Sequence, residues 1–76
     1  MDYRTLQEAR VALMINDARR RIARLAGFPA KHHRCVENGH ERHYIACRGT
    51  EIEVDPASRS SQQILRQWKN ASESAL

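Results

Sequence analysis

The chain of 76 residues has few cysteines and no long apolar run. Two cysteines do not make a disulfide scaffold, so we expect Cys35 and Cys47 to serve as small, half-buried apolar residues. No run approaches the ~18–20 apolar residues that cross a membrane. The first ten residues, MDYRTLQEAR, lack the basic and then apolar order of a signal peptide. These absences predict a cytoplasmic protein with no membrane association.

Metal-ligating residues are present but lack the spacing of a metal site. Zinc favours four such ligands, often including a closely spaced Cys pair, whereas eleven residues separate the two cysteines of this chain. Alternation along the predicted strands also divides the candidates between two faces. The candidates are His32, His33, Cys35, His40, His43 and Cys47. We therefore predict no metal and no other cofactor.

Positive charge is concentrated in the first half of the chain. Residues 1–35 hold eight basic and three acidic residues, whereas residues 36–76 hold five basic and six acidic residues. A basic region attracts polyanions, which favours a nucleic acid or an acidic protein partner without separating the two. With one Phe, one Trp and two Tyr, the chain is not expected to bind bases mainly by stacking.

Residues 2–26 are typical of a helix. Strong helix formers dominate, proline is absent, Thr5 and Glu8 fit a capping box, and Gly27 follows where a helix usually stops. One apolar stripe is predicted to face the core. It comprises Tyr3, Leu6, Met14, Ala18, Ile22 and Leu25.

Three further apolar residues, Val11, Leu13 and Ile15, lie off that stripe. The helix therefore either bends or breaks in two near Asn16 and Asp17, or shows a second face to a partner chain. A single helix of about 25 residues would be a rod of ~37 Å, long for so small a domain. That overhang favours a protein partner or a homodimer formed through the N-terminal helix.

Three strands are predicted after Pro29. Asn38-Gly39 is a strong signal for a two-residue hairpin turn, and it joins strands over 31–37 and 40–47. Residues 48–50 form the next turn, and EIEVD (51–55) alternates apolar with acidic residues, as a half-buried strand does. A second helix follows over 62–71, with Ser60 or Ser61 as its N-cap.

This order predicts an α+β domain, α-β-β-β-α, with both helices on one face of a three-stranded antiparallel sheet. That is the architecture of double-stranded-RNA-binding domains. We expect one small domain over 1–76, with a helical extension (1–17), a core (18–72) and a frayed tail (73–76).

A two-residue turn also assigns side chains to the two faces of the sheet. It pairs Glu37 with His40, Cys35 with Arg42 and His33 with Tyr44, and paired residues share a face. Val36, Ile45, Cys47 and His43 then face the helices. The open face carries His33, His40, Arg42 and Tyr44, a set that can take up a nucleotide.

Arginines of the first helix are candidates for phosphate binding, because arginine binds phosphate through paired hydrogen bonds as well as charge. The alternative is a solvated helix face. The candidates for binding a nucleic acid or a partner are Arg19, Arg20, Arg24, Lys31, His33, Arg42 and Tyr44.

Four short motifs occur in the order seen in HicA-type mRNA interferase toxins. They are AGF (26–28), NGHERHY (38–44), EIEV (51–54) and ILRQW (64–68), and the chain resembles that family over roughly residues 18–70. The resemblance implies a fold like that of double-stranded-RNA-binding domains. It also implies metal-independent RNA cleavage by His40 and an antitoxin that masks this residue.

Two functions are consistent with these observations. The first is a HicA-like RNA endonuclease in which His40 is the general acid or base and Arg42 and His43 lie near the scissile phosphate. The alternative is a non-catalytic small protein of a phage or mobile element that binds nucleic acid or inhibits a host protein.

Overall fold

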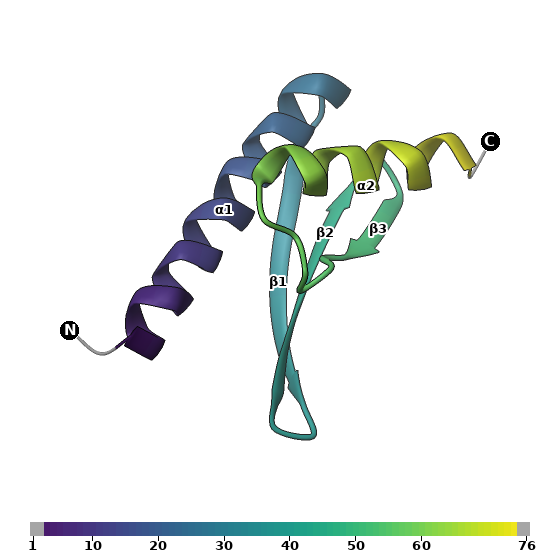
Figure 1. Cartoon of the computed structure of the whole chain (residues 1–76). Coiled ribbons are helices and arrows are strands. Elements are labelled where there is room, and N and C mark those ends of the chain that lie inside the picture. Colours follow the sequence, from purple (N-terminus) through teal and green to yellow (C-terminus); the bar gives the residue numbers. More distant parts are fainter. Residues whose placement is uncertain (1–2, 75–76) are drawn as a thin grey trace.

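The computed structural model describes residues 3–74 and has five elements in the order α-β-β-β-α, which confirms the predicted fold (Figure 1). Helix α1 spans Tyr3–Ala26 and helix α2 spans Ser61–Ser74. Strands β1 (Ala30–Glu37), β2 (His40–Cys47) and β3 (Thr50–Glu53) form one antiparallel sheet in that order. Among the described residues no helix is long and apolar enough to cross a membrane.

Helix α1 runs without a break from Tyr3 to Ala26, so the two-helix alternative is wrong. The described part of the helix already includes Tyr3, so Thr5 lies inside the helix and the prediction that Thr5 caps it is wrong. The C-terminal end of α1 lies where it was predicted. Gly27 has a φ of 65°, and the Phe28 amide donates to the Ala23 carbonyl at 3.1 Å, as at a helix end with a left-handed residue.

The core face of α1 differs from the predicted stripe. Ile15, Ala18 and Ile22 are buried and Val11 and Met14 are partly buried, so two residues that were placed off the stripe belong to the core. Conversely, three predicted core residues are largely exposed. They are Tyr3 (76% exposed), Leu6 (45%) and Leu25 (54%). The N-terminal half of α1 projects past the β1 edge of the sheet (Figure 1), so within residues 3–74 no strand covers Tyr3 and Leu6.

Both hairpins close through two-residue turns. Asn38 and Gly39 have φ values of 52° and 78°, and Arg48 and Gly49 have 52° and 80°, as type I′ turns require. The predicted register of β1 and β2 is confirmed, including the Glu37–His40 pair next to the turn. Thr50, which was predicted in the second turn, already belongs to β3.

Helix α2 begins as the cap signal predicts. The Gln63 amide donates to Ser60 Oγ at 3.3 Å, so Ser60 is the N-cap. The helix continues to Ser74, beyond the predicted end at residue 71. Residues 73 and 74, which were predicted to belong to a frayed tail, are therefore helical, and residues 75–76 of that tail lie outside the described residues. Trp68 is buried, and its Nε1 donates to the Thr50 carbonyl at 3.3 Å, which fixes α2 against β3.

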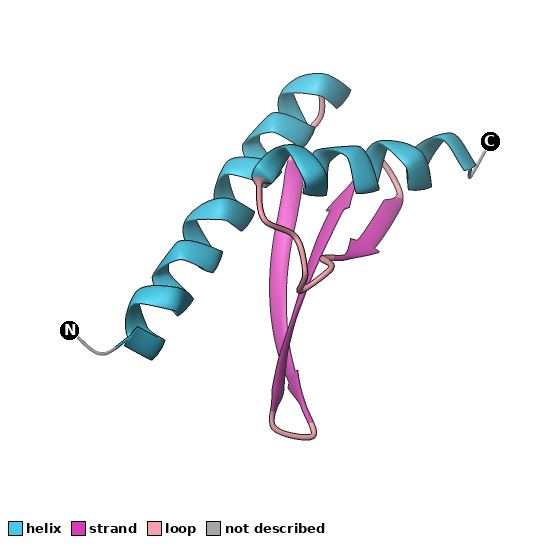
Figure 2. Ribbon diagram, viewed as in Figure 1, coloured by secondary structure: helices cyan, strands magenta, loops and turns pink. Residues whose placement is uncertain are grey.

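The core lies between the sheet and the two helices, which both cover one face of the sheet (Figure 2). Its sheet residues are Ala30, Ile45, Cys47, Ile52 and Val54. Both cysteines are free, as expected, with Cys47 buried and Cys35 partly exposed. Burial raises the pKa of the Cys47 thiol, so this thiol stays protonated. The second face of the sheet has no covering layer within residues 3–74.

Candidate nucleic-acid interface

His40 lies at the tip of the long β1–β2 hairpin, directly after the Asn38-Gly39 turn. The register places it on the open face of the sheet together with Arg42 and Tyr44, as predicted, and its side chain is exposed. The hairpin extends well beyond the four residues of β3 (Figure 1). His40 is therefore accessible to a large ligand.

Arg42 is held by two carboxylates rather than left free for phosphate. Its Nη1 lies 3.0 Å from Glu37 Oε2, and its Nε lies 3.3 Å from Glu53 Oε1. A hydrogen bond with Tyr44 and the charges of both glutamates raise the pKa of Arg42. Since both carboxylates neutralise this guanidinium, a phosphate would have to displace them.

The open face is not basic as a whole. His33 stacks on Tyr44 with ring centroids 4.9 Å apart, and its Nδ1 lies 4.0 Å from Glu51. With neutral histidines, two cations oppose three carboxylates on this face, a net formal charge of −1. The charged residues are Lys31 and Arg42 against Glu37, Glu51 and Glu53. A polyanion gains little from long-range attraction to this face.

On the helix side of the hairpin, two histidines form a pair that the sequence reasoning missed. His32 Nε2 lies 3.0 Å from His43 Nδ1, and the rings stack with centroids 5.2 Å apart. His43 Nε2 in turn lies 3.5 Å from Glu41, which also binds Arg34 at 2.8 Å. The predicted register already placed both rings diagonally on one face, and that was the available signal.

The side chains around the histidine pair do not form a metal site. Within residues 3–74, no three His, Cys, Asp or Glu side chains are placed to hold one ion. The pair is instead a hydrogen-bonded contact between β1 and β2.

The His32 pair gives stability a pH dependence. Burial, followed by the positive charge of His43, lowers the pKa of His32 below 6.5, with smaller contributions from His33, Arg19 and Arg34. The unfolded chain then binds the proton more readily than the folded chain. We therefore expect the free energy of unfolding to have its full value above pH 6.5 and to decrease as the pH is lowered below 6.5. The change is a fraction of that for a fully buried group, because His32 is largely exposed.

Urea unfolding at pH 7.5, 6.5 and 5.5 checks this expectation. His32→Gln should show a flatter dependence than the wild type. The control His33→Gln, on the opposite face, should keep the wild-type slope. Equal slopes for wild type and His32→Gln would contradict the assignment.

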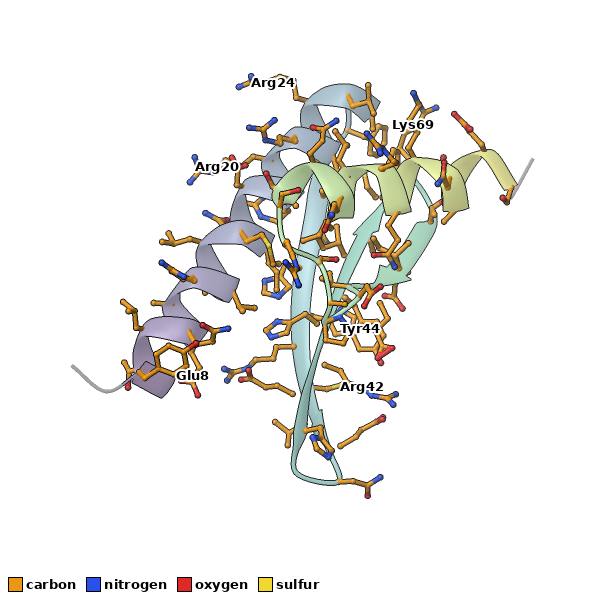
Figure 3. All side chains as sticks on the ribbon, viewed as in Figure 1. Glu8, Arg20, Arg24, Arg42, Tyr44 and Lys69 are labelled. Carbon is orange, nitrogen blue, oxygen red and sulfur yellow. The ribbon has the colours of Figure 1, made fainter. Side chains whose placement is uncertain are left out.

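The arginines of α1 divide into those that support the fold and those that are free. Arg19 Nη1 donates to the Ala30 carbonyl at 3.4 Å, and Arg21 Nε lies 2.8 Å from Asp17. Arg20 and Arg24 are exposed, lie one turn apart and form no ion pair within residues 3–74. Both point away from the sheet (Figure 3). We call these two residues the arginine row.

Asp17 explains why Arg21 is not part of this row. Its carboxylate accepts a hydrogen bond from the Ser61 hydroxyl at 2.6 Å and another from Arg21. These two bonds, Ser61 first, lower the pKa of Asp17, so the carboxylate stays ionised and holds Arg21 near the start of α2.

Cations of α2 that sequence reasoning did not select also face outward. Arg66 and Lys69 are exposed, and both lie opposite the buried Ile64 and Trp68. Lys69 and Arg24 lie at the same end of the molecule, opposite the hairpin tip (Figure 3). The three-residue spacing of Arg66 and Lys69 on one helix face was the signal that could have identified them.

The candidate residues therefore form two separate groups. His33, His40, Arg42 and Tyr44 share the open sheet face, and Lys31 lies on that face near the base of the hairpin. The arginine row lies on the outer face of α1, toward the end opposite the hairpin tip (Figure 3). The structure does not bring His40 to the arginine row.

A cleft of about 450 Å³ lies beside the hairpin, between α1 and the segment that follows β3. Val11, Met14 and Val54 form its apolar side, while His43 and Glu53 are among its polar residues. Comparison of the chain with family models, with curated proteins and with solved structures found no match.

Proposed function

We propose that the protein binds RNA in the cytoplasm, through the arginine row on α1 together with the outward cations of α2. The observation that carries this proposal is the distribution of ion pairs. Arg34 and Arg42 of the hairpin are bound to carboxylates, whereas Arg20 and Arg24 are exposed and form no ion pair within residues 3–74.

Free guanidinium groups on a helix suit the phosphate backbone. Each can form two parallel hydrogen bonds to one phosphate, and the counterions released from the nucleic acid add to the affinity. The helix layer also carries the positive charge of the molecule, while the open sheet face has a net charge of −1 from its five charged residues. Binding of this kind reads the backbone more than the bases.

Anisotropy of a fluorescein-labelled RNA hairpin, measured from 50 to 300 mM NaCl, tests the proposal. We expect log K to fall linearly with log[salt], by about 0.7–0.9 per phosphate neutralised. Competition with a DNA duplex of the same length separates RNA from DNA preference. Affinity that does not change with salt, or no binding at 100 μM protein, would overturn the proposal.

RNA cleavage by His40 is a second candidate, supported by the exposure of this imidazole at the hairpin tip. A HicA-like protein would use it as a general acid or base, with Arg42 two residues away, and an antitoxin or another protein would mask the tip. Such proton transfer contributes roughly 10²–10⁴-fold to a rate.

Incubating labelled RNA with chelator present tests this candidate. We expect the wild type to cleave the RNA and His40→Ala to be at least about 100-fold slower. His33→Ala, which removes an exposed histidine of the same face that is a candidate for binding and not for proton transfer, is the matched control and should retain the cleavage rate at saturating RNA. If the wild type leaves the RNA intact, the cleavage candidate is excluded and the proposal of RNA binding without catalysis stands.

A further inference from the structure

The two edges of the sheet are not equally protected. At the β3 edge, the Gln67 side chain donates to the Glu53 carbonyl at 2.7 Å and accepts from the Asp55 amide at 3.3 Å. Among the described side chains, the β1 edge has one comparable contact, from Arg19 to the Ala30 carbonyl at 3.4 Å. Beyond Ala30 the rest of this eight-residue strand is an open edge (Figure 1).

The register identifies the groups on that edge. Residues next to a two-residue turn form a hydrogen-bonded pair, and bonded and non-bonded pairs then alternate along the ladder. His32, Arg34 and Val36 are in non-bonded pairs, so their N–H and C=O groups point outward. In agreement, His43, opposite Arg34, accepts from the Val54 amide at 2.8 Å and so faces away from β1.

Helix α1 extends past this edge. Its N-terminal half projects to the side of β1 away from β2 (Figure 1), and its described side chains from Thr5 to Arg10 are exposed. A groove of about 450 Å³ separates Glu8 and Ala12 of this overhang from Arg34 and His43 of the hairpin. The overhang therefore borders an unfilled space beside an unpaired strand.

We propose that a second copy of the chain pairs antiparallel with β1, which forms a continuous six-stranded sheet with both α1 helices on the same face. The added strands extend the sheet beneath each overhang. Val36, an aliphatic side chain that is 65% exposed on the helix side, then gains a covering layer. Such a two-fold interface uses the same surface on both copies, the commonest arrangement among oligomers.

The charges along β1 select the register. Beyond Ala30, the outward groups of this strand belong to His32, Arg34 and Val36, so a two-fold axis that pairs them passes through residue 33, 34 or 35. An axis at Arg34 sets two arginines opposite each other, and an axis at His33 sets no carboxylate opposite a cation.

An axis at Cys35 avoids both problems. It sets His33 opposite Glu37 of the second copy and Arg34 opposite Val36 of the second copy, so no like charges face each other. It also sets the two Cys35 thiols opposite each other, in a non-hydrogen-bonded pair with Cα atoms about 4.5 Å apart. We assign this register.

Sedimentation equilibrium from 5 to 500 μM tests the pairing. We expect the mass to rise from 8.8 kDa toward twice that value. Val36→Pro removes an outward N–H without removing a bond of the chain's own ladder, so it should remain monomeric. Val36→Thr retains the N–H and should dimerise like the wild type. A wild type that stays monomeric at 500 μM, or a Val36→Pro that dimerises equally well, would overturn the proposal.

Amide hydrogen exchange tests the wild type without any substitution. With the axis at Cys35, the amides of Arg34 and Val36 should exchange more slowly at high than at low protein concentration, whereas those of His33, Cys35 and Glu37 should be protected at both. Exchange at the first two amides that is independent of concentration would refute the β1 interface.

Oxidation with diamide reports the register, since two thiols set opposite each other lose two protons and two electrons to the reagent and form a disulfide. We expect a covalent dimer from the wild type and none from Cys35→Ser. A dimer in solution that does not cross-link would exclude the axis at Cys35.

Discussion

Ile22→Ala is expected to destabilise the fold by about 2–5 kcal/mol, a large part of the total for a chain of this length. Ile22 of α1 is fully buried in the core, with 0% of its surface exposed. The substitution removes the transfer free energy of three carbon groups and leaves a cavity that a small core cannot close. Urea unfolding followed by circular dichroism measures the loss, and we expect the midpoint to fall while the m-value stays constant.

Leu13→Ala in the same helix is the matched control. It removes the same number of carbon atoms from a side chain that is 70% exposed, and alanine is a slightly better helix former. We expect a change within about 0.5 kcal/mol. A comparable loss for both variants would mean that the outer face of α1 is covered in solution, contrary to the assigned core.

The fold was predictable because its local signals agree with one another. Asn38-Gly39 tolerates the positive φ of a type I′ turn, and that turn alone determines the register of β1 and β2. Gly27 ends α1, and Ser60 starts α2 through a side-chain bond to an otherwise unpaired amide. Each signal acts within a few residues, so no knowledge of distant contacts was needed.

The buried face of α1 was not predictable in the same way. Apolar residues occupy more than half of its circumference, so their periodicity does not select one face. Ile15 and Val11 are covered because the sheet and α2 pack against that side, while Leu25 and Leu6 remain exposed. Only the tertiary contacts distinguish these two groups.

The candidate site shows the same division. The assignment of His40 and Arg42 to the open face followed from one turn and is confirmed. The neutralisation of Arg42 could not be predicted, because Glu53 reaches it across the β2–β3 ladder and that second register was not assigned in advance. Long-range pairing therefore changed Arg42 from a phosphate-binding candidate into a member of an ion-pair network.

The double variant Arg20→Gln/Arg24→Gln is expected to bind RNA roughly 60-fold more weakly in 0.1 M salt. Two lost phosphate contacts each remove a slope of about 0.9 from the dependence of log K on log[salt], so the slope should also fall by nearly two. Both side chains are exposed and neither forms an ion pair within residues 3–74, so the fold should be unaffected. Anisotropy across the salt series measures both quantities.

Arg34→Gln/Arg42→Gln changes the net charge equally and is the matched control. These arginines are already bound to Glu41, Glu37 and Glu53, so their loss should change RNA affinity by no more than about threefold. The reverse pattern, a large loss for the hairpin pair and a small one for the helix pair, would place the RNA on the hairpin beside His40. Equal losses would indicate that net charge, rather than the arginine row, determines binding.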